Sequence, residues 1–276
     1  MRGEVFVADA HSHVFLDPTR VYRRTVHFTE RDLVESMDRN GIDLAVVIAR
    51  PTEHLRVEEL RVLHDRTAAA VAAEHGRLVG FCWAAPRLGQ AGVDEVRRCL
   101  RELSYVGIKL HPSQERFNID DDELFPYAEL AREHGVPVTV HTQLAVRGSE
   151  PWRLLPLADR FPDVTFVMAH LGGDGGMVQT LAAAKIAAEY PNIAVEVSTT
   201  VTDPGATYLG PAQILGPERV LFGSDAPLHQ AALNLLKLDL LEMPDDWRAL
   251  IAGGNLLRLL RRDVRRPSAK SPTARQ

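Results

Sequence analysis

Short apolar runs rich in β-branched residues recur along this chain, and each is followed by a segment with helical spacing. The runs cover residues 4–8, 44–49, 78–83, 105–110, 137–141, 164–170, 193–198 and 219–223. Continuous apolar strands are typical of a parallel sheet that is buried on both faces. Strand–helix pairs repeated in this way predict an α/β fold, a distorted (β/α)8 TIM barrel, for which about 250 residues suffice.

An open, doubly wound sheet is the alternative architecture. No GxGxxG motif follows the first run, which disfavours a dinucleotide-binding sheet. No Pro-, Gly- and Ser-rich linker interrupts the chain, so we expect one barrel domain over residues 1–260. Residues 261–276 are basic and poor in apolar residues, and we expect a disordered tail there.

Charge and cysteine content narrow the functional class. The net charge of −5 argues against a general nucleic-acid binder. Cys82 and Cys99 are the two cysteines and form no CxxC motif, so a reducing cytoplasm is the simpler location. We find neither a signal peptide nor an apolar run of about 18 residues. We therefore expect a cytoplasmic protein with a small-molecule substrate, without a nucleic-acid or membrane partner, and we consider a homodimer as its assembly.

The stretch DAHSHVF places His11 and His13 directly after the first apolar run. Side chains alternate along a strand, so these two imidazoles point the same way. In a barrel, the carboxyl end of a strand faces the mouth where catalytic groups gather. An HxH pair by itself is a weak indication of a metal site.

Other runs end in similar residues. The further polar residues at strand ends are Lys109, His111, His141, His170 and Asp225. Such groups cost desolvation free energy unless they have partners, and a shared metal ion supplies partners. Imidazole and carboxylate ligands without thiolate suit zinc or another divalent first-row ion.

These motifs together resemble the amidohydrolase superfamily, in particular its amidohydrolase-2 branch, which includes aminocarboxymuconate-semialdehyde decarboxylase-like enzymes. The resemblance rests on DAHSH, GIKLHP, VHTQ, AHLGG, GSDAP and the terminal NLLRLL, in that order. It implies a barrel with a metal ion, most simply Zn²⁺, at its mouth.

The resemblance also implies roles for individual residues. His11, His13 and His141 would bind the metal. His170 would orient the reactive water or act as a further ligand. Asp225 would bind the metal and accept a proton from the metal-bound water.

Each of these residues has a simpler alternative. His170 could be a core histidine bonded to a carbonyl, and Asp225 could be the N-cap of the last helical region. Lys109 could be carboxylated and bridge two metal ions, so we expect one ion and allow for two. Without that modification, Lys109 could bind an anionic substrate or pair with Asp225. His111 could contact substrate or be structural.

Arginines follow four of the predicted strands, where barrel loops build the pocket. They are Arg50, Arg87, Arg116 and Arg147. Guanidinium groups suit carboxylates, so a small anionic substrate is our hypothesis, with Arg50 and Arg147 as binding residues. Surface arginines without a role in binding are the alternative. Trp83 and Trp152 could likewise line the mouth or simply pack.

The sequence therefore predicts a metal-dependent hydrolase that cleaves an amide, ester or lactone with an activated water. Decarboxylation of an aromatic or dienoic acid is the alternative reaction. A non-catalytic metal-binding protein is a further alternative from a different class.

Overall fold

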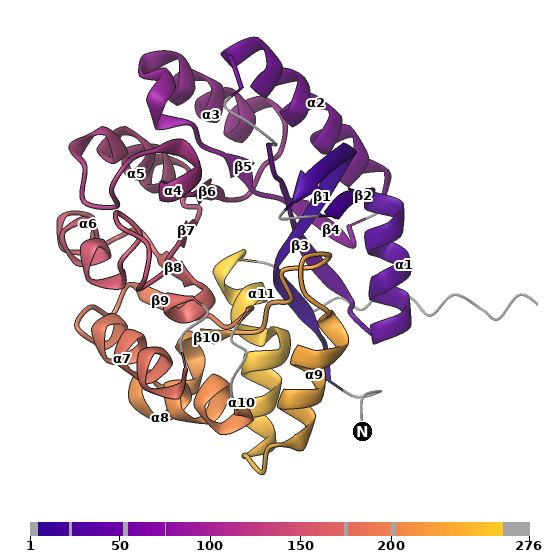
Figure 1. Cartoon of the computed structure of the whole chain (residues 1–276), viewed down its shortest axis with the longest axis vertical. Coiled ribbons are helices and arrows are strands. Elements are labelled where there is room, and N and C mark those ends of the chain that lie inside the picture. Colours follow the sequence, from indigo (N-terminus) through magenta and orange to yellow (C-terminus); the bar gives the residue numbers. More distant parts are fainter. Residues whose placement is uncertain are drawn as a thin grey trace, which may run out of the picture.

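Parallel strands form the centre of the molecule and helices surround them (Figure 1). The computed structural model describes residues 5–21, 24–51, 55–74, 76–173, 176–199 and 203–261. The barrel strands are β1 (Ala8–Val21), β3 (Leu44–Ala49), β4 (Leu78–Gly80), β5 (Cys82–Trp83), β6 (Ile108–Leu110), β7 (Val138–His141), β8 (Phe166–Ala169), β9 (Ile193–Glu196) and β10 (Val220–Leu221). All six residues of β3 are buried, as expected for a sheet covered on both faces.

The strands form two hydrogen-bonded sheets, with the orders β2-β1-β3-β4 and β10-β9-β8-β7-β6-β5. Phe81 separates β4 from β5, and its N–H donates to the carbonyl of Val47 at 3.0 Å. One predicted strand, residues 78–83, thus pairs with both sheets. On the other side, Ala10 N–H donates to Phe222 O at 2.9 Å and joins β1 to β10. These contacts connect the sheets around the barrel.

Helices follow most of the strands. The α-helices are α1 (Glu30–Asn40), α2 (Val57–Ala73), α3 (Gln90–Glu102), α4 (Pro112–Glu115), α5 (Phe125–His134), α6 (Leu155–Arg160), α7 (Met177–Ala188), α8 (Gly210–Leu215), α9 (Ala231–Leu240), α10 (Asp245–Ala249) and α11 (Asn255–Leu259). Shorter 3-10 turns cover Pro86–Leu88, Asp122–Leu124, Pro151–Leu154, His170–Gly172 and Pro217–Arg219, and π turns cover Gly205–Leu209 and Leu250–Gly254.

Local sequence sets the ends of α1. Thr29 and Asp32 form a reciprocal capping box at its start. At its end Gly41 adopts φ 68°, a left-handed conformation that favours glycine. Both ends follow the signals in the sequence.

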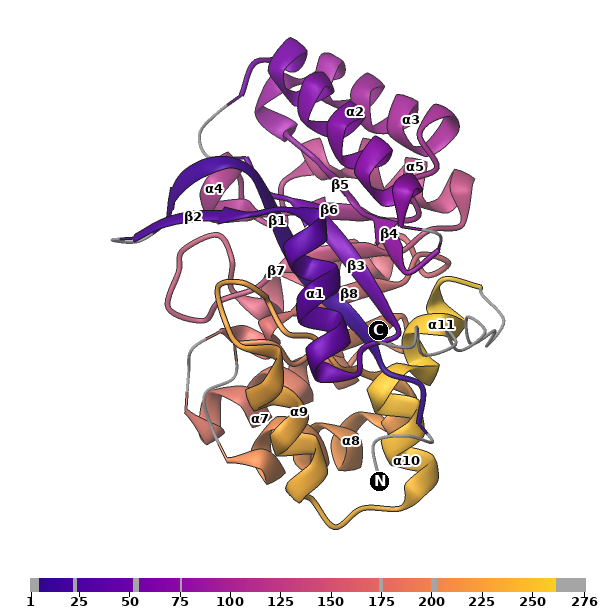
Figure 2. The same ribbon diagram turned by 90° about the vertical axis from the view of Figure 1, so that its right-hand side faces the viewer.

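The first strand is longer than predicted and lies further along the chain. We predict it at residues 4–8, whereas β1 runs from Ala8 to Val21 and contains both histidines of the HxH motif. Its first part pairs with β3, and its second part pairs antiparallel with β2 (Arg24–Phe28). The polar side chains do not end the strand because its backbone hydrogen bonds continue with these two partners. Figure 2 shows this hairpin projecting from one end of the barrel.

A register shift lies inside the HxH region. Asp9 pairs with Ala45 and Ser12 pairs with Val47, so β1 uses one residue more than β3 over this interval. Such a β-bulge re-aims side chains locally and is frequent beside active sites. It lies where the side chain of His11 turns into the barrel mouth.

No helix within the described ranges is both long enough and apolar enough to span a bilayer. The predicted tail falls almost wholly at residues 262–276, outside the described part of the chain.

Candidate metal centre

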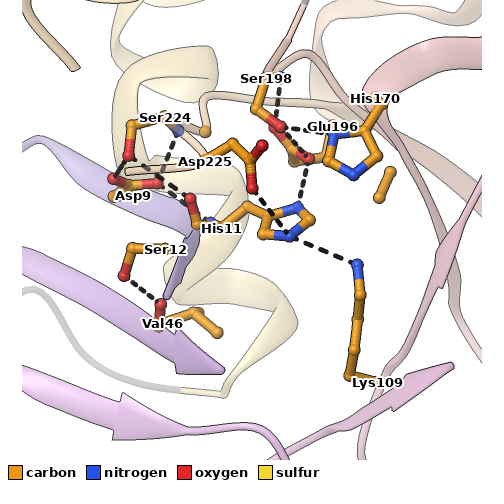
Figure 3. A network of polar contacts seen from close by, with 12 residues as sticks. Asp9, His11, Ser12, Val46, Lys109, His170, Glu196, Ser198, Ser224 and Asp225 are labelled. Carbon is orange, nitrogen blue, oxygen red and sulfur yellow. Dashed lines mark hydrogen bonds and ion pairs between the residues drawn. The ribbon is translucent and has the colours of Figure 1, made fainter. Parts of the chain in front are cut away.

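The residues predicted from strand ends gather at the barrel mouth. His11 and His13 come from β1, Lys109 from β6, and His141 from the end of β7. His170 and Asp225 follow β8 and β10. All are buried except His141, which is half-buried. Figure 3 shows His11, Lys109, His170 and Asp225 pointing toward one another.

Three ligand atoms form a compact cluster. His13 Nε2 lies 3.0 Å from Asp225 Oδ1, and His11 Nε2 lies 3.8 Å from the same oxygen. His11, His13 and Asp225 each offer one atom to a group in which all separations are within 4.8 Å. The structure therefore brings together the predicted ligands from the first and last barrel strands.

The chemistry of His13 fits a cation at this point. His13 Nδ1 lies 3.0 Å from the carbonyl oxygen of Ile48, which can only accept, so Nδ1 carries the proton. Burial lowers the pKa of His13, although its hydrogen bond with Asp225 and the charge of Asp225 oppose this shift. Burial acts to raise the pKa of Asp225, but its contacts with His13 and His170 lower it to about 2. When Nε2 is unprotonated, its lone pair and the carboxylate of Asp225 repel each other at this separation unless a cation compensates them.

Other imidazoles surround the cluster. The rings of His111 and His141 are stacked with centroids 3.9 Å apart, and the ring of His141 lies 4.6 Å from that of His170. Burial lowers the pKa of His111 and His141 well below its usual value. Burial also lowers the pKa of His170 to about 3, against the opposing charge of Asp225. These neutral rings can serve as ligands or proton acceptors, and His141 reaches the cluster through His170.

Lys109 approaches the same centre. Its Nζ lies 3.3 Å from His11 Nε2. Burial lowers the pKa of Lys109 to about 7, although the charges of Asp225 and Glu196 oppose this shift. A neutral amine in reach of the ligands is what carboxylation would require, and a charged one would bind an anion. The choice between these roles stays a prediction.

The backbone at Asp225 and His170 adopts unusual conformations. Asp225 has φ 55° and His170 has φ 65°, both in the left-handed region that non-glycine residues rarely occupy. Strained residues of this kind cluster at functional sites. The N–H of Asp225 donates to His11 O at 2.7 Å, which holds the two ligand strands together.

The simpler alternatives for these two residues do not hold. Helix α9 begins at Ala231 with Gln230 as its N-cap, so Asp225 does not cap it. His170 Nδ1 is bonded to Ser198 Oγ at 2.9 Å and not to a backbone carbonyl.

The Amidohydro_2 family model, described as amidohydrolase, matches residues 8–262. The chain belongs to this amidohydrolase family. The match to this family model confirms the resemblance that the sequence motifs indicate.

One curated relative is 2-amino-3-carboxymuconate-6-semialdehyde decarboxylase of Dictyostelium discoideum. It is 25% identical over 138 residues, which cover 47% of this chain and 35% of the relative. The chain thus matches about a third of that relative's length.

Solved structures show the same fold. The 2,6-dihydroxybenzoate decarboxylase from Rhizobium has a TM-score of 0.76 at 15% identity, covering 93% of this chain and 99% of its own. The 5-carboxyvanillate decarboxylase from Novosphingobium aromaticivorans, complexed with manganese, has a TM-score of 0.72 at 16% identity, covering 94% and 97%. These likenesses support the TIM-barrel architecture of this amidohydrolase.

The predicted substrate arginines differ in position. Arg50 lines a cavity of about 330 Å³ together with His111, and its Nε donates to Gln114 Oε1 at 3.1 Å. Arg147 is exposed in the loop after β7. Arg87 is engaged with buried Glu115, at 2.8 Å from Nε to Oε2. Of these three arginines, Arg50 is thus the one that shares this cavity with His111.

The remaining candidates, one arginine and two tryptophans, differ in how exposed their side chains are. Arg116 is exposed and ends α4. Trp83 is buried, with its ring centroid 5.5 Å from that of His111, whereas Trp152 is 48% exposed. Trp83 therefore packs beneath the mouth.

The sequence interpretation missed two carboxylates in the amidohydrolase site. Glu196 on β9 receives a hydrogen bond from His11 Nδ1 at 2.8 Å. Burial raises the pKa of Glu196 to about 8, against hydrogen bonds from Ser198. Asp9 accepts hydrogen bonds from Ser224 N and His11 N, at 2.9 and 3.0 Å. Burial raises the pKa of Asp9 to about 7 against these bonds.

The sequence contains an indication of both Glu196 and Asp9 as buried carboxylates. Glu196 is the ionisable residue inside the apolar run IAVEVS, and Asp9 is the first residue of DAHSH. Buried carboxylates of this kind require partners, and applying that rule to run 193–198 would have found Glu196.

Proposed function

We propose that this chain is a metal-dependent decarboxylase of a small aromatic or dienoic carboxylic acid. The observation that carries the proposal is the cluster of His11 Nε2, His13 Nε2 and Asp225 Oδ1 within 4.8 Å. The names of the relatives support decarboxylation, which is the alternative raised from the sequence, over hydrolysis.

The residues that would hold a divalent ion are His11, His13 and Asp225, with His141 and His170 as further candidates. Nitrogen and oxygen donors without thiolate suit both zinc and manganese. Manganese is bound in the 5-carboxyvanillate decarboxylase described above. When bound, such an ion supplies positive charge that withdraws electrons from the substrate's oxygen atoms.

The reaction replaces a C–C bond by a C–H bond: the carboxylate carbon leaves as CO2 and one proton is added to the carbon it leaves. A general acid within reach of that carbon must therefore supply the proton. We assign this role to Asp225, which as a carboxylate would first take up the proton, and to His170, the neighbouring imidazole that can exchange a proton with it. Asp225 is buried, so a carbon bound beside it would be shielded from bulk water.

Substrate recognition would come from the cationic side of the site. Arg50 lines the cavity beside His111. Lys109 is buried next to His11, with 3.3 Å between its Nζ and His11 Nε2. Guanidinium and ammonium groups bind carboxylates, so both favour an acidic substrate.

The test is product analysis with metal-loaded protein and a panel of aromatic and dienoic acids in D2O. We expect CO2 release with one deuterium incorporated at the carbon that lost the carboxylate. Removal of metal by a chelator should abolish release, and addition of manganese or zinc should restore it. Esters, lactones and amides belong in the same panel, because hydrolysis without CO2 release would replace decarboxylation as the function.

A further inference from the structure

Two residues that the reaction itself does not use connect imidazoles from different strands. Glu196 Oε2 lies 2.8 Å from His11 Nδ1 and 2.9 Å from Ser198 Oγ. Ser198 Oγ in turn lies 2.9 Å from His170 Nδ1. The chain of contacts His11–Glu196–Ser198–His170 runs through the interior of the barrel (Figure 3).

Both residues in the middle are built into the protein core. Glu196 and Ser198 are fully buried. The backbone N–H of Ser198 also donates to Glu196 Oε1, so the carboxylate is held against its own strand end. Because water does not reach these groups, their hydrogen bonds must be satisfied among themselves.

The donors and acceptors along this chain of contacts can be assigned from the number of protons. The ionised form of Glu196 only accepts hydrogen bonds, so in this form Ser198 donates its single hydroxyl proton to Oε2, while the backbone N–H of Ser198 donates to Oε1. Ser198 Oγ then has only lone pairs left for His170, and His170 Nδ1 must donate to it. By the same reasoning, His11 Nδ1 donates to Glu196.

We propose that Glu196 and Ser198 are positioning residues that hold His11 and His170 in the Nδ1–H tautomer and leave both Nε2 atoms unprotonated. The inference deepens the proposed function, on which its consequence for catalysis rests. The tautomer of an imidazole is set by the hydrogen bond of its other nitrogen, and metal-binding histidines commonly carry such a carboxylate or carbonyl partner.

The consequence for the site is specific. His11 Nε2 faces Lys109 and Asp225 and must have a free lone pair to bind a metal. His170 Nε2, on the opposite edge of the ring from Ser198, must have a free lone pair to take up a proton. One carboxylate thus prepares a metal ligand directly and a proton acceptor through a single hydroxyl.

The first test reads the tautomers directly in metal-free protein without substrate. Long-range ¹H–¹⁵N NMR of ¹⁵N-histidine-labelled wild type distinguishes protonated from unprotonated ring nitrogens, with His11→Gln and His170→Gln variants for assignment. We expect protonated Nδ1 and unprotonated Nε2 in both rings. Protonated Nε2 in His170 would overturn the proposal, because Ser198 would then donate to His170 and not to Glu196.

The second test separates the two positioning residues. In Ser198→Ala, His170 should lose its single tautomer while His11 keeps it, and in Glu196→Gln both rings should change. Ser198→Thr keeps the hydroxyl and should restore the His170 signal. A Ser198→Ala spectrum with His170 unchanged would also overturn the proposal.

Zinc affinity and kinetics also distinguish positioning from a purely structural role. A structural role would not weaken zinc binding in one variant and lower kcat at unchanged KM in the other. Glu196→Gln should weaken zinc affinity about 10- to 100-fold, the range typical for loss of a group behind a metal ligand. Ser198→Ala should lower kcat about tenfold or more at unchanged KM, because Ser198 touches the proton acceptor and not the substrate. Equal zinc affinity for wild type and Glu196→Gln would contradict the role of Glu196.

Ser149→Ala is the matched control. Ser149 is equally buried, and its hydroxyl makes no hydrogen bond within the described part of the chain. Its loss should leave histidine tautomers, zinc affinity and kcat at wild-type values. Because the NMR test uses neither metal nor substrate, a failure to decarboxylate any acid would not alter its outcome.

Discussion

Glu95 on α3 is a buried carboxylate that is not part of the metal centre, and its loss should destabilise the fold in a pH-dependent way. It accepts hydrogen bonds from Arg98 Nη2 and Nε at 2.8 and 2.9 Å. His64 Nδ1 on α2 lies 2.8 Å away, and Arg61 Nε lies 3.2 Å away. The substitution Glu95→Gln keeps the size of this side chain but places an amide N–H₂ among donors.

The expected loss of unfolding free energy in Glu95→Gln follows from the pKa of Glu95 in the folded protein. Burial acts to raise this pKa, but hydrogen bonds from His64 and Arg98 and their charge lower it from 4.5 to about 2. This difference corresponds to about 3 kcal/mol of unfolding free energy at neutral pH. Arg61 is half-exposed, so solvent screens part of the interaction. We therefore expect Glu95→Gln to lose about 2 kcal/mol at pH 7.

The sign of the pH dependence is fixed by linkage. The folded-state pKa lies below the unfolded one, so the contribution is present above pH 4.5 and is lost as the pH falls toward 2. The wild-type protein should lose about 1 kcal/mol of this contribution to its unfolding free energy when the pH falls to about 3.5. Glu95→Gln lacks this carboxyl group, so the difference from wild type should shrink as the pH falls.

The assay is urea unfolding followed by circular dichroism, in the presence of a chelator, at several pH values between about 3.5 and 7. Glu129→Gln is the control, because Glu129 forms an exposed ion pair with Arg132 and should change stability by less than about 0.5 kcal/mol. A difference between wild type and Glu95→Gln that is the same at every pH would refute the reasoning, as would no difference at pH 7.

Three predictions concern the site. Asp225→Asn should lower kcat by about 10²- to 10⁴-fold with an unchanged circular dichroism spectrum, and a fully active variant would contradict its proton role. Arg50→Met should raise KM for an acidic substrate about tenfold, and Arg147→Met should raise it less because Arg147 is exposed; unchanged kinetics in both would remove the anion-binding hypothesis. Elemental analysis should find about one metal ion per chain, and two ions would indicate a carboxylated Lys109 that bridges them.

Most of the barrel could be predicted because its strands are buried on both faces. Such strands appear in the sequence as continuous apolar runs, and the run 44–49 coincides with β3. The first strand was misplaced because the interpretation ended it where polar residues begin. In the barrel, these polar side chains point into a site that supplies partners, and the backbone pairing continues beneath them.

The candidate site was predicted in outline. The positions of His11, His13 and Asp225 at strand ends were enough to expect that they meet, since parallel strands bring their carboxyl ends to one face. Glu196 and Ser198 were missed because their roles depend on contacts with His11 and His170 from other strands. The distances that would fix His141 as a ligand also depend on packing between strands.

The sequence by itself determined the barrel and the identity of the polar groups at its mouth, because apolar periodicity and residue type are local properties of the chain. The tertiary structure alone decided which of these groups touch. It placed Glu196 behind His11, Ser198 behind His170 and Asp225 opposite His13, since a hydrogen bond requires two groups to meet within about 3 Å across strands distant in sequence.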